Sequence, residues 1–319
     1  MKYNRILGII CATLALAASF SALPLFAYSV ETLPGMPVSN DFVVGPGKQE
    51  LTLNPGESKT IDLTVTNRMG EDKTFSIGVE DFTGSQNVDQ TVVLLGDDRG
   101  PYSLKDYISV PEKEFTLKHG ERATIPVTIS IPADAEPGGL YGSVVVSTVS
   151  RPSSGEGSGA AAVVSRIGTL FFVTVPGAVA REGDLQSFKI AGGKHVFSSG
   201  PIQFQLLFQN TGAIHLDPYG EIDIKNILGE EVGQMIVDPW FALPDSLRLR
   251  EVSWDRGTLF GVYTATAKIN RGYDDIIDEK SVTFVVVPWK YLLAAFGAAF
   301  LLILLVRFIA SKFEIRRKN

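Results

Sequence analysis

The chain has 319 residues, a formal net charge of −6 at pH 7 and a hydrophobic content of 45%. Because basic residues cluster at its two ends, the part between them is more acidic still, which argues against nucleic acid as a partner, since phosphate binding needs a basic surface. The single cysteine, Cys11, lies in the N-terminal apolar stretch, so the rest of the chain offers no disulfide, thiolate zinc site or cysteine nucleophile.

The chain opens on an apolar segment. Lys2 and Arg5 precede the apolar stretch 6–26, and residues 27–29 provide small side chains at the spacing that signal peptidase reads. We therefore expect residues 1–29 to be a signal peptide. An uncleaved helix is the alternative, and it would keep the same orientation because its positive charges also lie on the cytoplasmic side.

Residues 30–180 alternate in the manner of antiparallel strands. A turn at 54–56 is followed by apolar side chains at every second position up to Asn67, which is the pattern of a half-buried strand. The same pattern predicts further strands over residues 75–79, 115–117, 125–131 and 163–175.

An irregular excursion at residues 83–101 is too long for an ordinary turn. It is either a functional loop or a surface segment that covers the edge of the sandwich. One helical turn is expected after it, at residues 103–107, with Ser103 as the N-cap.

A Pro/Gly-rich stretch leads into the strand that starts near Tyr141. In a tyrosine corner, a hydroxyl at this place bonds back to upstream backbone and pins the sandwich. A Gly/Ser-rich segment, residues 153–159, is expected to be a hairpin loop after that strand. The residues of the predicted structural motifs in this domain are Asn67, Pro137, Gly138, Gly139 and Tyr141.

Residues 181–288 repeat this order in a shorter form. The strand at 204–210 closes on Asn210, and Tyr263 follows a glycine-containing turn as Tyr141 does. We therefore predict an all-β chain with two tandem immunoglobulin-like β-sandwich domains.

The C-terminal region has the length and composition of a membrane anchor. Residues 289–310 form an apolar run long enough to cross a hydrocarbon core as a helix. The tail, residues 311–319, is basic and is expected in the cytoplasm, so residues 30–288 face outward as an ectodomain.

Motifs of catalysis are missing from the sequence. It contains no nucleophile elbow, phosphate-binding loop, dinucleotide fingerprint or zinc-binding helix motif. The histidines at 119, 195 and 215 have no ligand-like neighbours, and acidic groups at 97–98 and 274–279 do not match a calcium loop. We predict no enzyme activity, no metal site and no cofactor.

Two neighbouring aromatic residues give a modest binding signal. Trp240 and Phe241 follow a proline in the second domain, and exposed aromatic rings stack on sugars or anchor a protein partner. We predict these two residues as ligand-binding candidates, with core packing as the alternative.

Three stretches, residues 51–67, 102–132 and 137–147, resemble the N-terminal peptidoglycan-binding domain of the WxL-interacting cell-surface proteins of Gram-positive bacteria. The layout of that family is similar too, with a signal peptide, a second immunoglobulin-like domain, a C-terminal transmembrane helix and a short basic tail.

The resemblance implies a non-enzymatic adaptor of the cell surface. Its outer domain would contact peptidoglycan or another cell-wall glycan, its second domain would contact a surface protein, and its C-terminal helix would sit in the lipid bilayer. Two other classes stay open. A chaperone-like module for secreted or pilus proteins would need a free strand edge, and a surface adhesin would need exposed binding loops.

Overall fold

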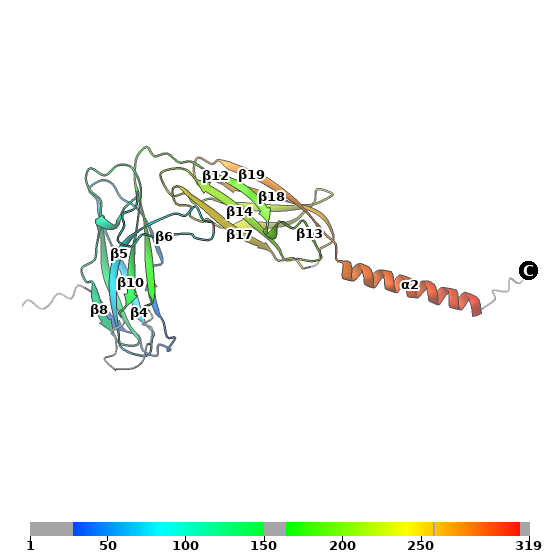
Figure 1. Ribbon diagram of the computed structural model, residues 1–319, viewed down its shortest axis with the longest axis horizontal. Helices are drawn as coiled ribbons and strands as arrows, with labels where there is room; N and C mark the ends of the chain where they lie inside the picture. Colours follow the sequence, from blue (N-terminus) through cyan, green and yellow to red (C-terminus); the bar gives the residue numbers. More distant parts are fainter. Residues whose placement is uncertain (1–27, 150–163, 258, 313–319) are drawn as a thin grey trace, which may run out of the picture.

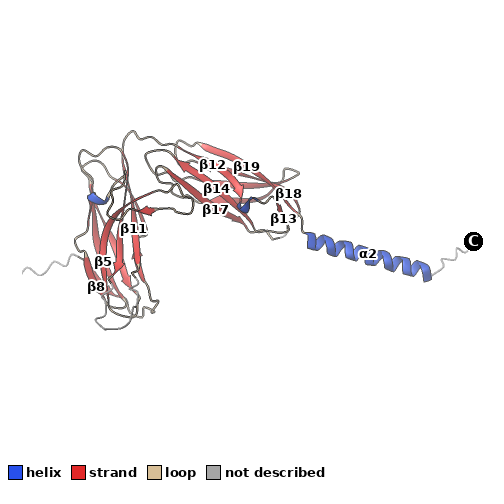
Figure 2. Cartoon of the chain, viewed as in Figure 1, coloured by secondary structure: helices blue, strands red, loops and turns tan. Residues whose placement is uncertain are grey.

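The structure, a computed structural model, describes residues 28–149, 164–257 and 259–312. The expected signal peptide and hairpin loop 153–159 lie outside these residues, as does the basic tail beyond Lys312. Within them the chain is all-β, apart from two short 3-10 turns and one α-helix near the C-terminus (Figure 2).

The strands before residue 180 form two sheets. The first has the order β1 (Ser29–Thr32), β9 (Glu121–Ser130), β4 (Ser58–Asn67) and β2 (Phe42–Gly45), with β7 (Ile108–Ser109) also on β9. The second has the order β3 (Lys48–Thr52), β11 (Arg166–Val175), β10 (Gly138–Thr148), β5 (Lys73–Thr83) and β6 (Val93–Leu94), with β8 (Glu114–Leu117) also on β5.

The strands after residue 180 form a second pair of sheets. One contains β12 (Gly183–Ile190), β14 (Ile202–Asn210) and β17 (Ser246–Trp254). The other has the order β13 (Val196–Phe197), β19 (Ile277–Val286), β18 (Gly261–Asn270), β15 (Tyr219–Asn226) and β16 (Glu231–Val237).

The two domains share one topology. In each, an early strand pairs in parallel with the last strand, β3 with β11 and β13 with β19, whereas the other pairs are antiparallel. The strand that precedes β3 or β13 in the sequence, β2 or β12, lies in the opposite sheet. The first strands of each domain thus contribute to both sheets and connect the two layers of the immunoglobulin-like sandwich.

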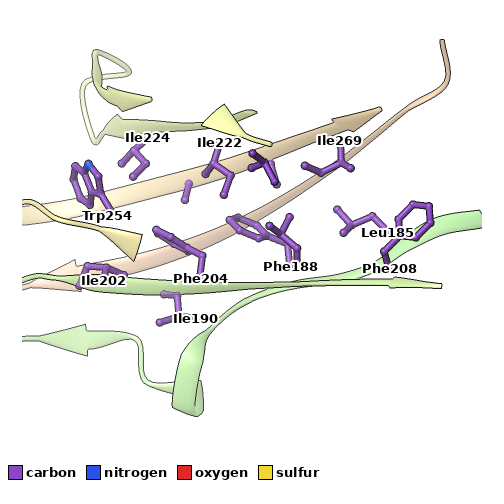
Figure 3. Packing of buried hydrophobic residues seen from close by; sticks show 14 of the residues in the cluster. Leu185, Phe188, Ile190, Ile202, Phe204, Phe208, Ile222, Ile224, Trp254 and Ile269 are labelled. Atoms are coloured by element: carbon purple, nitrogen blue, oxygen red, sulfur yellow. The ribbon is translucent and has the colours of Figure 1, made fainter. Parts of the chain in front are cut away.

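Each sandwich encloses its own apolar core. On β14 the residues Ile202, Phe204, Leu206 and Phe208 point inward and are fully buried, because side chains alternate between the two faces of a strand. Figure 3 shows Phe204 between the sheets of the second domain, and its ring lies 5.9 Å from that of Phe284 on β19. Burying each such side chain stabilises the fold by about 1.5–3 kcal/mol.

Several strands of the first domain were not expected from the sequence, among them the edge strands β1, β2 and β3 and the two-residue strands β6 and β7. β1, β2 and β3 are short, and most of their side chains are exposed or half-buried. They lack the alternation of apolar and polar residues that marks a half-buried strand, because they lie at sheet edges.

The expected helical turn exists, but Ser103 does not cap it. The 3-10 turn η1 spans Lys105–Tyr107, and the buried carboxylate of Asp81 on β5 accepts the backbone N–H groups of Leu104 and Lys105. It also accepts the N–H of Gly100 at 3.0 Å. A remote charged side chain therefore replaces the local cap, because a carboxylate satisfies several donors at once.

The helix α2, Trp289–Lys312, leaves the second domain at the end opposite the first domain (Figure 1). Its most apolar 18-residue window has a mean hydropathy of 2.6, and none of that window is buried against the protein. By length and composition it is able to cross a membrane.

Candidate functional site at the domain junction

The two sandwiches meet through an apolar cluster. Phe82, Tyr141 and Phe172 of the first domain pack with Leu243 of the second, and all four are at most 2% exposed. The ring of Phe172 lies 5.0 Å from that of Phe241, at an angle of 67°. Edge-to-face rings that are buried in this way add to the stability that burial alone provides.

The excursion at 83–101 contributes to this junction. Its Ser85 carbonyl accepts the backbone N–H of Leu247 at 3.0 Å, and the Gln86 amide donates to the carbonyl of Asp245 at 2.6 Å. Arg248 donates to the hydroxyl of Thr91. The excursion therefore joins the two domains, in addition to covering the edge of its own sandwich.

Tyr141 bonds across the junction, which corrects the expected tyrosine corner. Its hydroxyl accepts the backbone N–H of His215 at 2.7 Å and lies 3.3 Å from Nδ1 of the same histidine. Burial raises the pKa of the phenol, so it stays protonated. Gly139 makes room for this hydroxyl, since a Cβ there would overlap it.

The other predicted glycine and proline lie beside this contact. Gly138 has a φ of +156° at the start of β10, and Pro137 packs so closely on Gly177 that a side chain there would clash. The Pro/Gly-rich stretch thus shapes the first-domain side of the junction, because its small residues permit close approach.

Tyr263, at the equivalent place on β18, bonds within its own domain. Its hydroxyl donates to the carbonyl of Phe260 at 3.1 Å and accepts the N–H of Phe260 at 3.2 Å. This is a bond to backbone three residues upstream, as a tyrosine corner requires.

Three titratable side chains converge on the junction. Glu50 of β3 lies close to His215 and Asp217 of the second domain, with one ligand atom of each within 4.8 Å of the others. Burial lowers the pKa of His215, and burial together with the charge of Glu50 raises the pKa of Asp217. Two carboxyl groups and an imidazole at this spacing have the donor set of a divalent cation site.

The surroundings of the cluster are polar and carry positive charge. Lys48 forms an ion pair with Glu50, and its ammonium group lies 5.4 Å from the centre of the Phe172 ring and 5.3 Å from that of Phe241. A hollow of about 250 Å³ opens beside His215 and Asp217. Arg181 also lines it, so a cation here would compete with two basic side chains.

Sequence reasoning missed this cluster. His215 was expected to have no ligand-like neighbour, but Asp217 lies two residues along the chain and Glu50 approaches from the other domain. The His-x-Asp spacing was visible in the sequence. Glu50 was not, because its proximity depends on how the two domains dock.

Of the predicted ligand-binding pair, Trp240 is buried and Phe241 is half-buried. Trp240 is 5% exposed and packs on Phe208, 6.2 Å away between ring centres. Phe241 belongs to the junction cluster, where Arg248 also lies over its ring. Direct binding of a ligand by these two rings stays a prediction.

Both predicted asparagines are buried and make equivalent bonds. Asn67 donates to the carbonyls of Glu71 and Leu117 and accepts the N–H of Met69. Asn210 donates to the carbonyls of Ile214 and Ala242 and accepts the N–H of Gly212. Each side chain therefore fixes the turn that follows its strand.

Residues 49–148 match the family described as WxL Interacting Protein, peptidoglycan binding domain. Over these residues the first domain is similar to the peptidoglycan-binding domain of the WxL-interacting protein family. The matched segment includes Glu50, Tyr141 and the excursion at 83–101, so it provides much of the first-domain side of the junction. No curated protein matches the chain.

Solved structures of fimbrial chaperones are also similar to this chain. A chaperone–tip adhesin complex of CFA/I fimbriae is 12% identical, with a TM-score of 0.37, and the match covers 78% of this chain and 99% of that one. The class 5 fimbriae chaperone CfaA is 13% identical, with a TM-score of 0.37 and coverage of 78% and 100%. At these TM-scores the fold assignment rests on the chain's own strand pairing.

Proposed function

We propose that this protein is a membrane-anchored, non-enzymatic adaptor whose first domain binds peptidoglycan. The observation that carries the proposal is the match of residues 49–148 to a peptidoglycan-binding domain, on a chain that also has an exposed apolar helix. The second domain lies between the first domain and α2 (Figure 1), which supports a position of the second domain beside the bilayer and of the first domain farther out.

The orientation follows from charge. Lys312 ends α2, and Arg316, Arg317 and Lys318 follow in the tail. Positive residues beside a membrane helix remain on the cytoplasmic side, so both sandwiches would be extracellular. Protease added outside cells with a permeable wall should digest both sandwiches and spare α2 with the tail. Protection of the sandwiches would contradict this orientation.

The proposal of binding without catalysis is supported by the chemistry of the junction. The phenol of Tyr141 is kept protonated, and its hydroxyl already accepts the backbone N–H of His215. The carboxyl groups of Glu50 and Asp217 lie beside the basic side chains of Lys48 and Arg181, which favour a role in holding charge at the junction.

Sedimentation with purified peptidoglycan tests the proposal. The full chain in detergent micelles should sediment with the glycan and release no soluble sugar. A piece spanning residues 30–180 should also sediment, and a piece spanning residues 183–288 should not. Release of sugar would show an enzyme, and sedimentation of the second piece alone would transfer the binding to the region of Trp240 and Phe241.

The second domain is proposed to contact a surface protein, as the family resemblance implies. Beyond the junction contacts of Leu247 and Arg248, the outer sides of β14 and β17 are partly exposed to solvent and offer surface to a partner. Cross-linking on intact cells, with the full chain as bait, tests whether a protein partner is bound by this domain.

A further inference from the structure

One end of the second domain faces the start of α2. The last residue of β19, Val286, pairs with Gly261 at the beginning of β18, and Tyr263 of β18 pairs with Asn226 at the end of β15. The β15–β16 hairpin tip and the start of β18 therefore lie at the same end of the sheet as the helix, because strand register fixes these positions.

The link between this end and the helix is short and bonded. Val287 still donates its N–H to the carbonyl of Phe197 at 2.8 Å, and the N–H groups of Tyr291 and Leu292 are bonded to the carbonyl of Pro288. The helix thus starts at Trp289, directly after the sheet, and holds this end of the domain close to the surface of any bilayer that it crosses.

Large apolar side chains are exposed at this end. We call Ile227, Leu228 and Phe260 the membrane-side rim; they are 76%, 77% and 68% exposed. Scattered single apolar residues on a surface are ordinary, but two consecutive ones at a hairpin tip are not, because turns favour Gly, Asn, Asp, Ser and Pro. Folding of the sandwich gives no reason for them.

The hairpin tip is held rigidly. The Asn226 side chain accepts the N–H groups of Leu228 and Glu230, both at 3.0 Å, and Gly229 has a φ of +81° and donates to the Asn226 carbonyl. The N–H groups of Leu228, Gly229 and Glu230 are therefore bonded within the turn, and Ile227 and Leu228 are exposed. Pairing these donors lowers the cost of placing the tip in a layer poor in water.

Phe260 is presented in a similar way. Both polar groups of its backbone are bonded by the hydroxyl of Tyr263, and the neighbouring Leu259 is buried in the core at 3% exposure. The tyrosine corner of the second domain thus fixes the backbone from which the Phe260 ring projects.

We propose that the membrane-side rim rests in the interfacial layer of the bilayer that α2 spans. The occupant of the apolar surface is the lipid, because the rim is continuous with a membrane helix and lies where the headgroups and outer acyl segments would be. Amphipathic surfaces of this kind settle about 5–10 Å into the boundary between headgroups and acyl chains.

The rim would fix the tilt of the ectodomain. The helix alone is a single point of attachment, and it would let the sandwich pivot about residues 287–289. The rim adds a second contact on the opposite edge of the sheet, since β15 is separated from β19 by β18. Two contacts hold the long axis of the second domain in one range of angles, which directs the first domain outward.

The inference rests on the proposed membrane anchoring, and the experiment separates the two. The full chain, with Cys11→Ser, is placed in nanodiscs of phosphatidylcholine and carries one nitroxide label at a time. The labelled positions are Leu228→Cys, Phe260→Cys, Ile236→Cys and Leu301→Cys. The ratio of collision rates with oxygen and with a water-soluble nickel chelate reports whether each label lies in lipid or in water.

Ile236 is the matched control, because it is 78% exposed and lies on β16, the strand that forms the hairpin with β15. It pairs with Glu221, near the opposite end of the sheet from the helix. Labels at Leu228 and Phe260 should give a ratio several-fold higher than the label at Ile236. Leu301, in the middle of α2, should give the highest ratio.

Equal ratios at Leu228, Phe260 and Ile236, with a high ratio at Leu301, would overturn the rim and leave the anchor intact. A low ratio at Leu301 would overturn the anchor itself. Spin–spin broadening at Leu228 would show that a second copy of the chain covers the rim, which also contradicts lipid contact. With Ile227→Ser and Leu228→Ser combined, the Phe260 label should shift toward water, whereas Ile236→Ser should leave it unchanged.

Discussion

Asn67 and Asn210 close equivalent strands and make the same three hydrogen bonds, whereas Tyr141 and Tyr263, which also occupy equivalent strands, bond to different parts of the molecule. The asparagine serves each sandwich by itself. The tyrosine is local in the second domain and reaches the other domain from the first. Both domains thus use the buried asparagine to fix a turn of their own. The first domain uses its tyrosine to dock on the second domain.

This difference has a consequence for stability. Loss of an asparagine should damage one sandwich, and loss of a junction residue should separate two sandwiches that each stay folded. Tryptophan fluorescence distinguishes these cases, because Trp240 and Trp254 lie in the second domain, the third tryptophan is Trp289, and the first domain has none. Circular dichroism reports the strands of both domains.

The largest effect is expected from the asparagines. Asn67→Ala or Asn210→Ala leaves two carbonyls and one N–H without their partners in buried or half-buried surroundings. Each unpaired group costs about 1–3 kcal/mol when it is buried, so the loss should be on the order of 3 kcal/mol. Denaturant unfolding in detergent micelles measures it. Asn67→Ala should leave the transition seen by fluorescence in place, and Asn210→Ala should lower its midpoint.

Asn226→Ala is the control for this pair. Asn226 also ends a strand and bonds two backbone N–H groups, but it is only half-buried and its turn is exposed to water. In the piece that spans residues 183–288 and lacks α2, water replaces the lost bonds at this turn, so the cost should stay below about 1 kcal/mol. A loss as large as that of Asn210→Ala would contradict the role given to burial.

A smaller effect is expected from Gly84, where the excursion passes over the second domain. A Cβ at this position would overlap Ser246 and lie 3.0 Å from the Cβ of Leu243. Gly84→Ala should weaken the docking by about 2 kcal/mol, as other overpacked contacts do. Gly78→Ala, on β5 with nothing near the added atom, is its control.

Hydrogen exchange at Leu247 checks this prediction. The N–H of Leu247 is bonded to Ser85 of the other domain, so it should exchange faster when the excursion lifts away. Unchanged exchange in Gly84→Ala would contradict the close approach at Gly84.

The sequence predicted the fold of each sandwich well and the junction poorly. Alternation along residues 61–65 and 204–210 and the polar strand ends at Asn67 and Asn210 are local patterns, so they predicted strands that the structure contains. The family resemblance is confirmed over residues 49–148. The edge strands β1–β3 were missed, because their side chains are mostly in contact with water.

The candidate site could not be predicted for a different reason. Tyr141, Glu50 and Phe241 are separated by long stretches of sequence, and each has an ordinary local role available to it. Their meeting depends on the angle at which the domains dock, and no periodic pattern encodes that angle. The half-buried position of Phe241 follows from the same docking, and the buried position of Trp240 follows from the second core.

Removing either tyrosine hydroxyl should cost about 1 kcal/mol of stability, and the two losses should appear in different parts of the molecule. Tyr141→Phe leaves the His215 N–H without an acceptor in the junction, and Tyr263→Phe removes two bonds to Phe260 within the second domain. Tyr263→Phe should lower the midpoint seen by fluorescence. Tyr141→Phe should instead increase the difference in denaturant midpoint between the transition seen by fluorescence and the transition seen by circular dichroism. Identical effects of both substitutions would contradict the different directions of the two hydroxyls.

The smallest expected effect is a dependence of the junction on pH. Burial lowers the pKa of His215 from its ordinary value of 6.5, so the folded protein resists a proton that the unfolded chain accepts. The stability given by the neutral imidazole is complete above pH 6.5 and is lost as the pH falls below it. Asp217 works in the opposite direction, because its pKa is raised and protonation relieves its burial.

The variants His215→Gln and Asp217→Asn separate these two contributions. When the pH falls from 7.5 to 6, the free energy of unfolding of the wild-type chain should fall by less than about 1 kcal/mol relative to that of His215→Gln. His215→Gln is the reference because it keeps the backbone N–H that the Tyr141 hydroxyl accepts. Asp217→Asn should make the loss steeper, because the charge of Asp217 raises the pKa of His215 and partly offsets its burial. Denaturant unfolding at closely spaced pH values measures both slopes. The wild-type chain could instead gain stability relative to His215→Gln as the pH falls from 7.5 to 6. That result would show that Glu50 and Asp217 stabilise the imidazolium, and the direction assigned to the pKa of His215 would be wrong.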